Sequence, residues 1–439
     1  MAAVAVAAAL LPAAALTNAT SASANPQTDP TPPARMSTIG GERLGRPGTQ
    51  VNLGRNAPAL PKGITSRAWI VADAESGDVL AAHNAHWPLA PASTLKMLFA
   101  DLLLPRFPAD RTHTVRPSDL ADVGEGSSLV GIKENQTYTV RDLWLGVFLR
   151  SGNDAVHTLT AMNGGLEKTI REMNAHARML RAEDTHVVTP DGYDAEGQTS
   201  SAYDLTLIAR HGLQKADFRE YASTARAQFP GEQKKGQKKR PTFEIQNTNR
   251  LLTGDYGMDP YKGAAGVKNG YTTNAGHTLT AVAQRGDRVL LVTALHPEGG
   301  GLRVYQETAK LLDWGFEAAG MVEPVGVLVP PRDEDPGPTP VGEEGASDDK
   351  GGGRDTADTR EPEQPQGGVG TALTVVAGSL VVLAVGAYGV HRRWPLPTQA
   401  LRRRRRPEPP TDGAGGPAAG RRLGAWLRSR RRRGGTEEP

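Results

Sequence analysis

A serine and a lysine three residues apart are the first residues of this sequence that could do chemistry together. Ser93 and Lys96 lie in the segment Pro-Ala-Ser-Thr-Leu-Lys-Met-Leu, which predicts the start of a buried helix. Positions i and i+3 share one face of a helix, so the lysine amine is expected beside the serine hydroxyl. A neutral, desolvated lysine can take the hydroxyl proton and make the serine a nucleophile. The simpler alternative is a helix N-cap at Ser93 and a solvated Lys96.

A second polar group, Ser151-Gly152-Asn153, closes one apolar helical segment and opens the next. The hydroxyl of Ser151 could relay a proton, and the amide of Asn153 could hold a backbone amide of a substrate. The alternative is an ordinary turn, because Ser, Gly and Asn are typical turn residues.

A third group, Lys268-Asn269-Gly270-Tyr271, comes just before a predicted strand pair. Lys268 would place a positive charge beside an anionic substrate group, and Gly270 would let an extended substrate approach closely. The alternative here is a type I′ hairpin turn built on Asn-Gly.

The apolar periodicity predicts the elements that must position these groups. Two β-hairpins are expected, and most of residues 140–213 has a helical pattern. Residues 301–316 predict a closing amphipathic helix. The order strands, helices, strands, helix favours an α/β (α+β) domain with an antiparallel sheet flanked by helices and an inserted all-helical subdomain. The strands are expected at residues 68–73, 79–82, 277–283 and 288–293.

Both ends of the 439-residue chain differ in composition from its middle. Residues 1–24 are uncharged and rich in Ala, Leu and Val, which predicts a secretory signal peptide, with an uncleaved anchor or a start further upstream as alternatives. Residues 25–61 predict a disordered Pro-rich linker. The folded domain is expected at residues 62–330, and an acidic disordered linker at residues 331–368.

An uncharged run of 22 residues, 369–390, is long enough for a single C-terminal transmembrane helix. A buried core helix is the alternative, but both neighbouring segments resemble linkers. Residues 391–439 carry 14 arginines against 4 acids. Since positive flanks stay on the cytoplasmic side, we expect a single-pass protein of the cell membrane with its domain outside and this tail inside.

Charge and cysteine content exclude several classes of function. The net charge of +3 combines about +10 in the arginine-rich tail with about −7 elsewhere, so the folded domain is not a basic, nucleic-acid-binding surface. The tail is expected to be a topology signal with some contact to anionic lipid. The chain has no cysteine, which excludes disulfides and thiolate metal sites.

The three polar groups, in this order, resemble the S-x-x-K, S-x-N and K-T-G signature set of penicillin-binding proteins and serine β-lactamases. Flanking segments at residues 74–80, 189–205 and 311–316 are similar to low-molecular-weight D-alanyl-D-alanine carboxypeptidases of the peptidase S11 type. The resemblance covers about residues 62–320. It implies a β-lactamase/transpeptidase-like fold and a serine-type D-Ala-D-Ala carboxypeptidase acting on peptidoglycan stem peptides.

The resemblance also assigns roles at the reacting bond. Ser93 would be the nucleophile and Lys96 the general base, with Ser151 as the proton shuttle. Asn153 would hold the substrate amide and the lysine. Penicillin would acylate the same serine, and neither a cofactor nor a metal ion is implied.

The remaining roles concern substrate binding. Lys268 would bind the terminal carboxylate, and the backbone N–H groups of Ser93 and Tyr271 would form the oxyanion hole. Asn269 stands where the family has Thr, so an amide replaces a hydroxyl as donor to the carboxylate, with Gly270 beside it. The alternatives are a D,D-endopeptidase, a serine β-lactamase or a non-enzymatic penicillin-binding scaffold of the cell wall.

Overall fold

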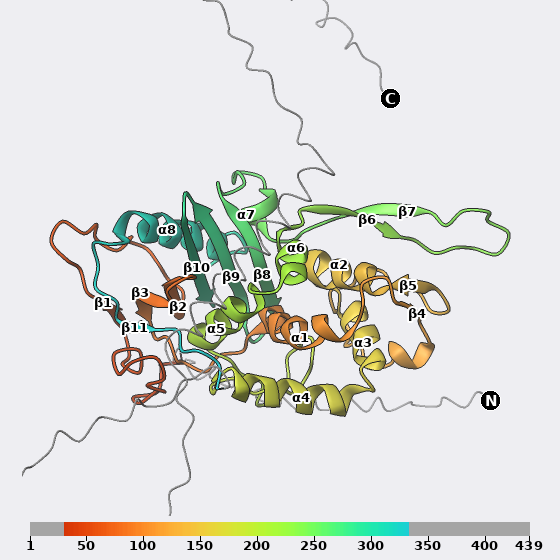
Figure 1. Cartoon of the computed structure of the whole chain (residues 1–439), viewed down its shortest axis with the longest axis horizontal. Coiled ribbons are helices and arrows are strands. Elements are labelled where there is room, and N and C mark those ends of the chain that lie inside the picture. Colours follow the sequence, from red (N-terminus) through yellow and green to blue (C-terminus); the bar gives the residue numbers. More distant parts are fainter. Residues whose placement is uncertain (1–29, 333–439) are drawn as a thin grey trace, which may run out of the picture. The chain divides into compact units, whose positions relative to one another are not determined.

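The computed structural model describes residues 30–332, which contain one seven-stranded antiparallel sheet (Figure 1). The strand order is β1-β3-β2-β10-β9-β8, and β11 pairs with β3. Strand β8 is therefore an edge strand, with one side open to a ligand. The strands are β1 (Thr49–Val51), β2 (Ala68–Asp73), β3 (Asp78–His83), β8 (Ala264–Thr272), β9 (Gly276–Arg285), β10 (Arg288–Leu295) and β11 (Gly326–Val327).

Strand β2 shows why helices cover both faces of the sheet. Its side chains alternate between the faces, as the two-residue period of a strand requires. Ile70 lies in the core shared with helices α1 (Lys96–Leu103) and α5 (Ala202–Gly212). Trp69 and Val71 lie in a second core beneath helix α8 (Arg303–Ala318). Burial of both faces fixes the strand between the two helical layers.

The other helices gather beside β8, at the opposite end of the domain from β1 and β11 (Figure 1). Hairpin β6–β7 projects beyond them. These elements are α2 (Val140–Arg150), α3 (Asn153–Met162), α4 (Leu166–Met179), α6 (Ala216–Ser223), α7 (Arg250–Thr253), the 3-10 turns η1 (Ala92–Leu95), η2 (Leu104–Arg106) and η3 (Pro117–Asp119), and the short strands β4 (Thr112–Thr114), β5 (Thr137–Thr139), β6 (Arg226–Pro230) and β7 (Thr242–Gln246).

The predicted hairpins and helices are confirmed with small shifts in their ends. The prediction that the inserted subdomain is all-helical is wrong, because the short antiparallel strand pairs β4–β5 and β6–β7 lie among its helices. Strands β2 and β3 form the first hairpin and β9 and β10 the second, and α8 is the closing helix. The segment at residues 140–213 forms helices α2 to α5, and its longest interruption is a loop at residues 180–201. That loop carries residues of the active site.

The prediction of a disordered linker at residues 25–61 is wrong from residue 30 onward. Leu44 is fully buried in the core, and β1 pairs with β3. The backbone oxygen of Gly40 accepts a hydrogen bond from the N–H of Val327. Backbone pairing and a few apolar side chains, with Leu44 the most deeply buried, hold this segment, and neither feature is visible in its Pro- and Gly-rich composition.

Several predicted segments lie outside the described residues. They are the signal peptide at residues 1–24, the acidic linker from residue 333, the membrane span at residues 369–390 and the arginine-rich tail. Within residues 30–332, no helix combines the length and apolar character needed to cross a membrane.

A buried carboxylate, Asp101, links helices α1, α4 and α5. It accepts hydrogen bonds from His176 on α4 and His211 on α5, each at 2.6 Å, and from Lys215 at 2.5 Å. Burial alone would raise the pKa of Asp101, but these two hydrogen bonds and the charge of Lys215 hold it well below its ordinary value. Asp101 is therefore ionised, and His176, His211 and Lys215 stabilise its negative charge.

Asp101→Ala is expected to lower the free energy of unfolding by about 3–5 kcal/mol, because it leaves buried donors without their acceptor. Denaturant unfolding of the purified protein measures this. Glu220→Ala, in the exposed ion pair between Arg141 and Glu220, is the control and should change stability by about 1 kcal/mol at most. Equal effects of the two substitutions would contradict the account.

Candidate active site

Ser93 lies in the turn η1, directly before α1 begins at Lys96. The predicted neighbourhood is confirmed, because Lys96 Nζ donates to Ser93 Oγ at 2.7 Å. Two hydroxyl groups hold this turn in place, because Thr94 and Thr278 both donate to the backbone oxygen of Pro91. Ser93 is thus neither a simple N-cap nor beside a solvated lysine.

Lys96 is almost fully buried, and its ammonium group has few partners there. Besides Ser93, its Nζ donates to the backbone oxygen of Asp191 at 2.5 Å. Burial lowers the pKa of Lys96 to about 8, against the opposing charges of Asp191 and Asp154. A lysine with this pKa is neutral often enough near neutral pH to act as a base.

Lys268 lies in the middle of edge strand β8 and is as deeply buried as Lys96. Its Nζ donates to the backbone oxygen of Asn269 at 2.7 Å. Burial lowers its pKa well below the ordinary value, and the charge of Lys96 lowers it further. A bound anion would favour the charged form, so the site is suited to a substrate carboxylate. The alternative of a hairpin turn at Lys268-Asn269-Gly270 is wrong, because these residues pair with β9.

Gly270 brings the backbone of β8 against the nucleophile. A Cβ atom at this position would lie 2.7 Å from the backbone nitrogen of Ser93 and 2.6 Å from Thr278 Oγ1. Only glycine fits so close an approach. Tyr271 follows as an exposed residue that lines the cleft, and its ring packs on His277.

Asn269 points its amide oxygen at Thr248, whose Oγ1 donates to it at 3.0 Å. Thr248 is held in turn, because its backbone oxygen accepts from the hydroxyl of Tyr305 on α8. The Asn269 side chain also hydrogen-bonds the Tyr305 hydroxyl, so both α8 and Thr248 hold it in place.

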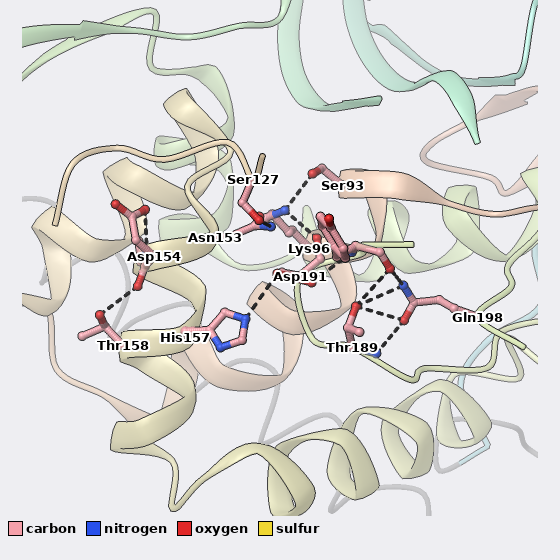
Figure 2. Close-up of polar contacts among 12 residues, drawn as sticks. Ser93, Lys96, Ser127, Asn153, Asp154, His157, Thr158, Thr189, Asp191 and Gln198 are labelled. Carbon is pink, nitrogen blue, oxygen red and sulfur yellow. Dashed lines mark hydrogen bonds and ion pairs between the residues drawn. The ribbon is translucent and has the colours of Figure 1, made fainter. Parts of the chain in front are cut away.

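The Ser151-Gly152-Asn153 group connects two helices, with Ser151 at the end of α2 and Asn153 at the start of α3. Ser151 ends α2 in the left-handed conformation (φ 55°), and its buried Oγ has no hydrogen-bond partner among the described residues. Asn153 begins α3 and donates from Nδ2 to Ser127 Oγ at 3.0 Å, while its Oδ1 is buried without a described partner (Figure 2). Both atoms are buried without a hydrogen-bond partner among the described residues, and of the two residues Asn153 lines the cleft that contains Ser93.

Ser127 was missed by the sequence reasoning, and so was the residue that positions it. The carboxylate of Asp154 accepts hydrogen bonds from three successive backbone N–H groups, those of Val130, Gly131 and Ile132. It thereby holds the loop that carries Ser127 against α3. The only signal in the sequence was an acid in the first turn of a helix, directly after Asn153.

Of these residues, Ser93, Ser127, Asn153 and Tyr271 line one cleft, whereas Lys96, Lys268 and Ser151 are buried and do not line it. Ser93 and Asn153 lie on its floor, with β8 on one side and the loops at residues 125–128 and 192–194 around it. Gln198 braces the second loop, since it accepts from the backbone N–H of Thr189 and donates to the backbone oxygen of Tyr193 (Figure 2). An extended peptide has room to lie along the open edge of β8.

The rate of acylation by penicillin is expected to rise with pH through a midpoint near 8, the pKa of Lys96. Only the neutral lysine accepts a proton, and each pH unit below the midpoint lowers the neutral fraction about tenfold. Labelling of the protein with fluorescent penicillin for fixed times between pH 6 and 9 measures this pH profile. A flat profile over this range would contradict a base role for Lys96.

Comparison with known proteins agrees with this geometry. Residues 55–297 match the peptidase S11 family model, described as D-alanyl-D-alanine carboxypeptidase. A D-alanyl-D-alanine carboxypeptidase of Mycobacterium tuberculosis is 36% identical over 262 residues, which are 58% of this chain and 84% of that protein. One of Escherichia coli is 33% identical over 273 residues, 58% of this chain and 64% of its own length.

Solved structures give the same result. The crystal structure of a D-alanyl-D-alanine carboxypeptidase from Mycobacterium tuberculosis has a TM-score of 0.56 at 34% identity, and the match covers 63% of this chain and 99% of that one. The Streptomyces K15 DD-transpeptidase has a TM-score of 0.54 at 26% identity, with coverage of 59% and 99%. This chain is thus similar to penicillin-binding DD-peptidases in fold as well as in sequence.

Proposed function

Because the chain belongs to the peptidase S11 family and is a serine D-Ala-D-Ala carboxypeptidase, we propose that its reaction proceeds through an acyl-enzyme on Ser93. The observation that carries this proposal is the contact of 2.7 Å between Lys96 Nζ and Ser93 Oγ in a buried site. Ser93 Oγ attacks the carbonyl carbon of the penultimate D-Ala as its proton passes to neutral Lys96. The C–N bond to the terminal D-Ala breaks, and the leaving amine receives a proton.

Water then cleaves the ester and regenerates Ser93. A β-lactam undergoes the acylation step alone, since its ring C–N bond breaks and the acyl group stays on the serine. We assign the transfer of a proton to the leaving amine to Ser151 rather than to Ser127, because Ser151 Oγ has no described partner whereas Ser127 Oγ accepts a hydrogen bond from Asn153.

Substrate binding follows from the positions along β8. Lys268 attracts the terminal carboxylate, and Asn153 holds the amide of the stem peptide. The backbone N–H groups of Ser93 and Tyr271 stabilise the oxyanion. The close approach required of Gly270 supports this assignment, because it keeps β8 beside the Ser93 N–H.

The test uses a peptide ending in D-Ala-D-Ala and fluorescent penicillin, with wild type and Ser93→Ala compared. Wild type should release D-Ala and become labelled, and the variant should do neither. Labelling without release would favour a penicillin-binding scaffold. Absence of both in the wild type would contradict the enzyme mechanism.

Asn269→Thr is expected to change the KM for the peptide and the efficiency of penicillin acylation by about fivefold, the effect of one hydrogen bond, while kcat remains measurable. The reason is that the two donors reach different distances toward the carboxylate. Thr248→Val, which frees the amide oxygen of Asn269, is the companion variant. If neither substitution alters KM or acylation, Asn269 does not contact the substrate.

We also propose that residues 369–390 anchor the protein in the cell membrane, with the catalytic domain outside and the arginine-rich tail inside. The length of the uncharged run and the arginines that follow it support this. Membrane fractionation of the full chain and of a chain ending before residue 369 tests it. Equal distribution of both between membrane and soluble fractions would contradict the proposal.

A further inference from the structure

Lys96 has a buried acid–histidine pair behind it, on the side away from the cleft (Figure 2). Asp191 presents its backbone oxygen to Lys96 Nζ at 2.5 Å. Its carboxylate turns toward α3, where Oδ2 lies 3.3 Å from His157 Nε2. The side chains of both residues are almost fully buried, at 2% and 7% exposure. A charge at Asp191 is therefore poorly screened by solvent.

Asp191 is held in one orientation. Its Oδ1 accepts a hydrogen bond from the backbone N–H of Tyr193 at 2.9 Å, within the loop that Gln198 braces. Burial would raise the pKa of Asp191, but the hydrogen bond from His157 and the charge of Lys96 outweigh it and hold the pKa at about 2. Asp191 is ionised throughout the working pH range.

Three charged groups face Lys96 from the elements packed around it. Asp191 comes from the loop at residues 180–201, Asp154 from α3 and Lys268 from β8. The charge of Asp154 is already spread over the backbone N–H groups of the loop that it holds. Asp191 differs from Asp154 in this respect, because the only group that contacts its Oδ2 among the described residues is the side chain of His157. Its effect on Lys96 therefore depends on that partner.

We propose that Asp191 and His157 act as a positioning pair for the base of this reaction: the Asp191 carboxylate favours the charged form of Lys96, and the His157 imidazole withdraws part of that negative charge so that the neutral base forms. The inference rests on the proposed role of Lys96 and adds the residues that set its protonation. Neither residue contacts the reacting bond. Both act through Lys96.

The two halves of the pair have opposite expected effects, which a purely structural role would not produce. Asp191→Asn removes the carboxylate charge, keeps the side-chain shape and retains an oxygen for the Tyr193 N–H. The midpoint of the pH profile should fall by about one unit. His157→Leu leaves the full charge of Asp191 facing Lys96, so the midpoint should rise. His157→Gln, which keeps a donor, should lie between His157→Leu and wild type.

The experiment measures the rate constant of Ser93 acylation by penicillin between pH 5.5 and 9.5 for the full chain and these variants. His113→Gln is the matched control, because His113 forms a similar pair with Asp119 at 2.7 Å outside the cleft. Its profile should coincide with that of wild type. Thermal melting of each variant separates a folding defect from a shift of the midpoint.

The proposal would be overturned if Asp191→Asn and His157→Leu shifted the midpoint in the same direction. It would also be overturned if both variants folded and neither midpoint moved. If Asp191→Asn does not fold, His157→Leu and His157→Gln decide the matter, since the upward shift must be larger for Leu. Failure of the proposed function looks different: wild type itself would then show no acylation at any pH.

Discussion

Lys96→Ala is expected to slow acylation of Ser93 about a thousandfold, with little change in the affinity for the intact peptide. The serine keeps its place in η1 but loses Lys96 Nζ, the one group among the described residues that is hydrogen-bonded to its hydroxyl. General bases typically contribute factors of this size. Pre-steady-state labelling with penicillin measures the acylation step directly, and equilibrium binding of the peptide to the variant measures affinity.

Lys96→Arg separates the basic function of the lysine from its charge. A guanidinium group keeps the positive charge near Ser93 but does not lose its proton in proteins. The arginine variant should therefore be as slow as the alanine variant at every pH. Recovery of fast acylation in Lys96→Arg would show that Lys96 acts as a fixed cation rather than as a base.

Gly270→Ala is expected to lower kcat/KM about a hundredfold, close to the loss of one oxyanion donor. The new Cβ would lie 2.7 Å from the Ser93 nitrogen and 2.9 Å from the Ala92 Cβ, so β8 must move away from the nucleophile. Steady-state release of D-Ala gives the effect. Acylation by penicillin should fall in parallel, because both reactions use the same oxyanion hole.

Gly300→Ala is the control for this substitution. A methyl group added at Gly300 would meet no described atom within 4 Å, and the position needs no left-handed backbone, so this variant should match wild type. If Gly270→Ala retains full activity while folding normally, β8 does not approach Ser93 as closely as the oxyanion assignment requires.

The central pair of the site could be predicted from sequence because its geometry is local. Ser93 and Lys96 are one helical turn apart, so their contact depends on the backbone of a single short segment. The four main strands were also predictable, since β2 and β10 are short, nearly continuous apolar runs whose two faces meet two helical layers. Lys268 and Gly270 required the family resemblance as well, because Asn-Gly alone favours a turn.

The surroundings of Lys96 depend on contacts between distant segments. Asp191 and His157 are 34 positions apart, and nothing in either segment indicates that a loop and a helix will bring them together. Ser127 and Asn153 meet for a similar reason, through a loop tied to Asp154. The ordered segment at residues 30–61 was misjudged because backbone pairing with β3 leaves no mark on composition.

The mass of the protein after brief exposure to benzylpenicillin, followed by peptide mapping, shows which residue is the nucleophile. We expect one covalent adduct, on the peptide that contains Ser93, and none in Ser93→Ala. An adduct on another residue, or an equal adduct in Ser93→Ala, would contradict the assignment of Ser93 as the nucleophile.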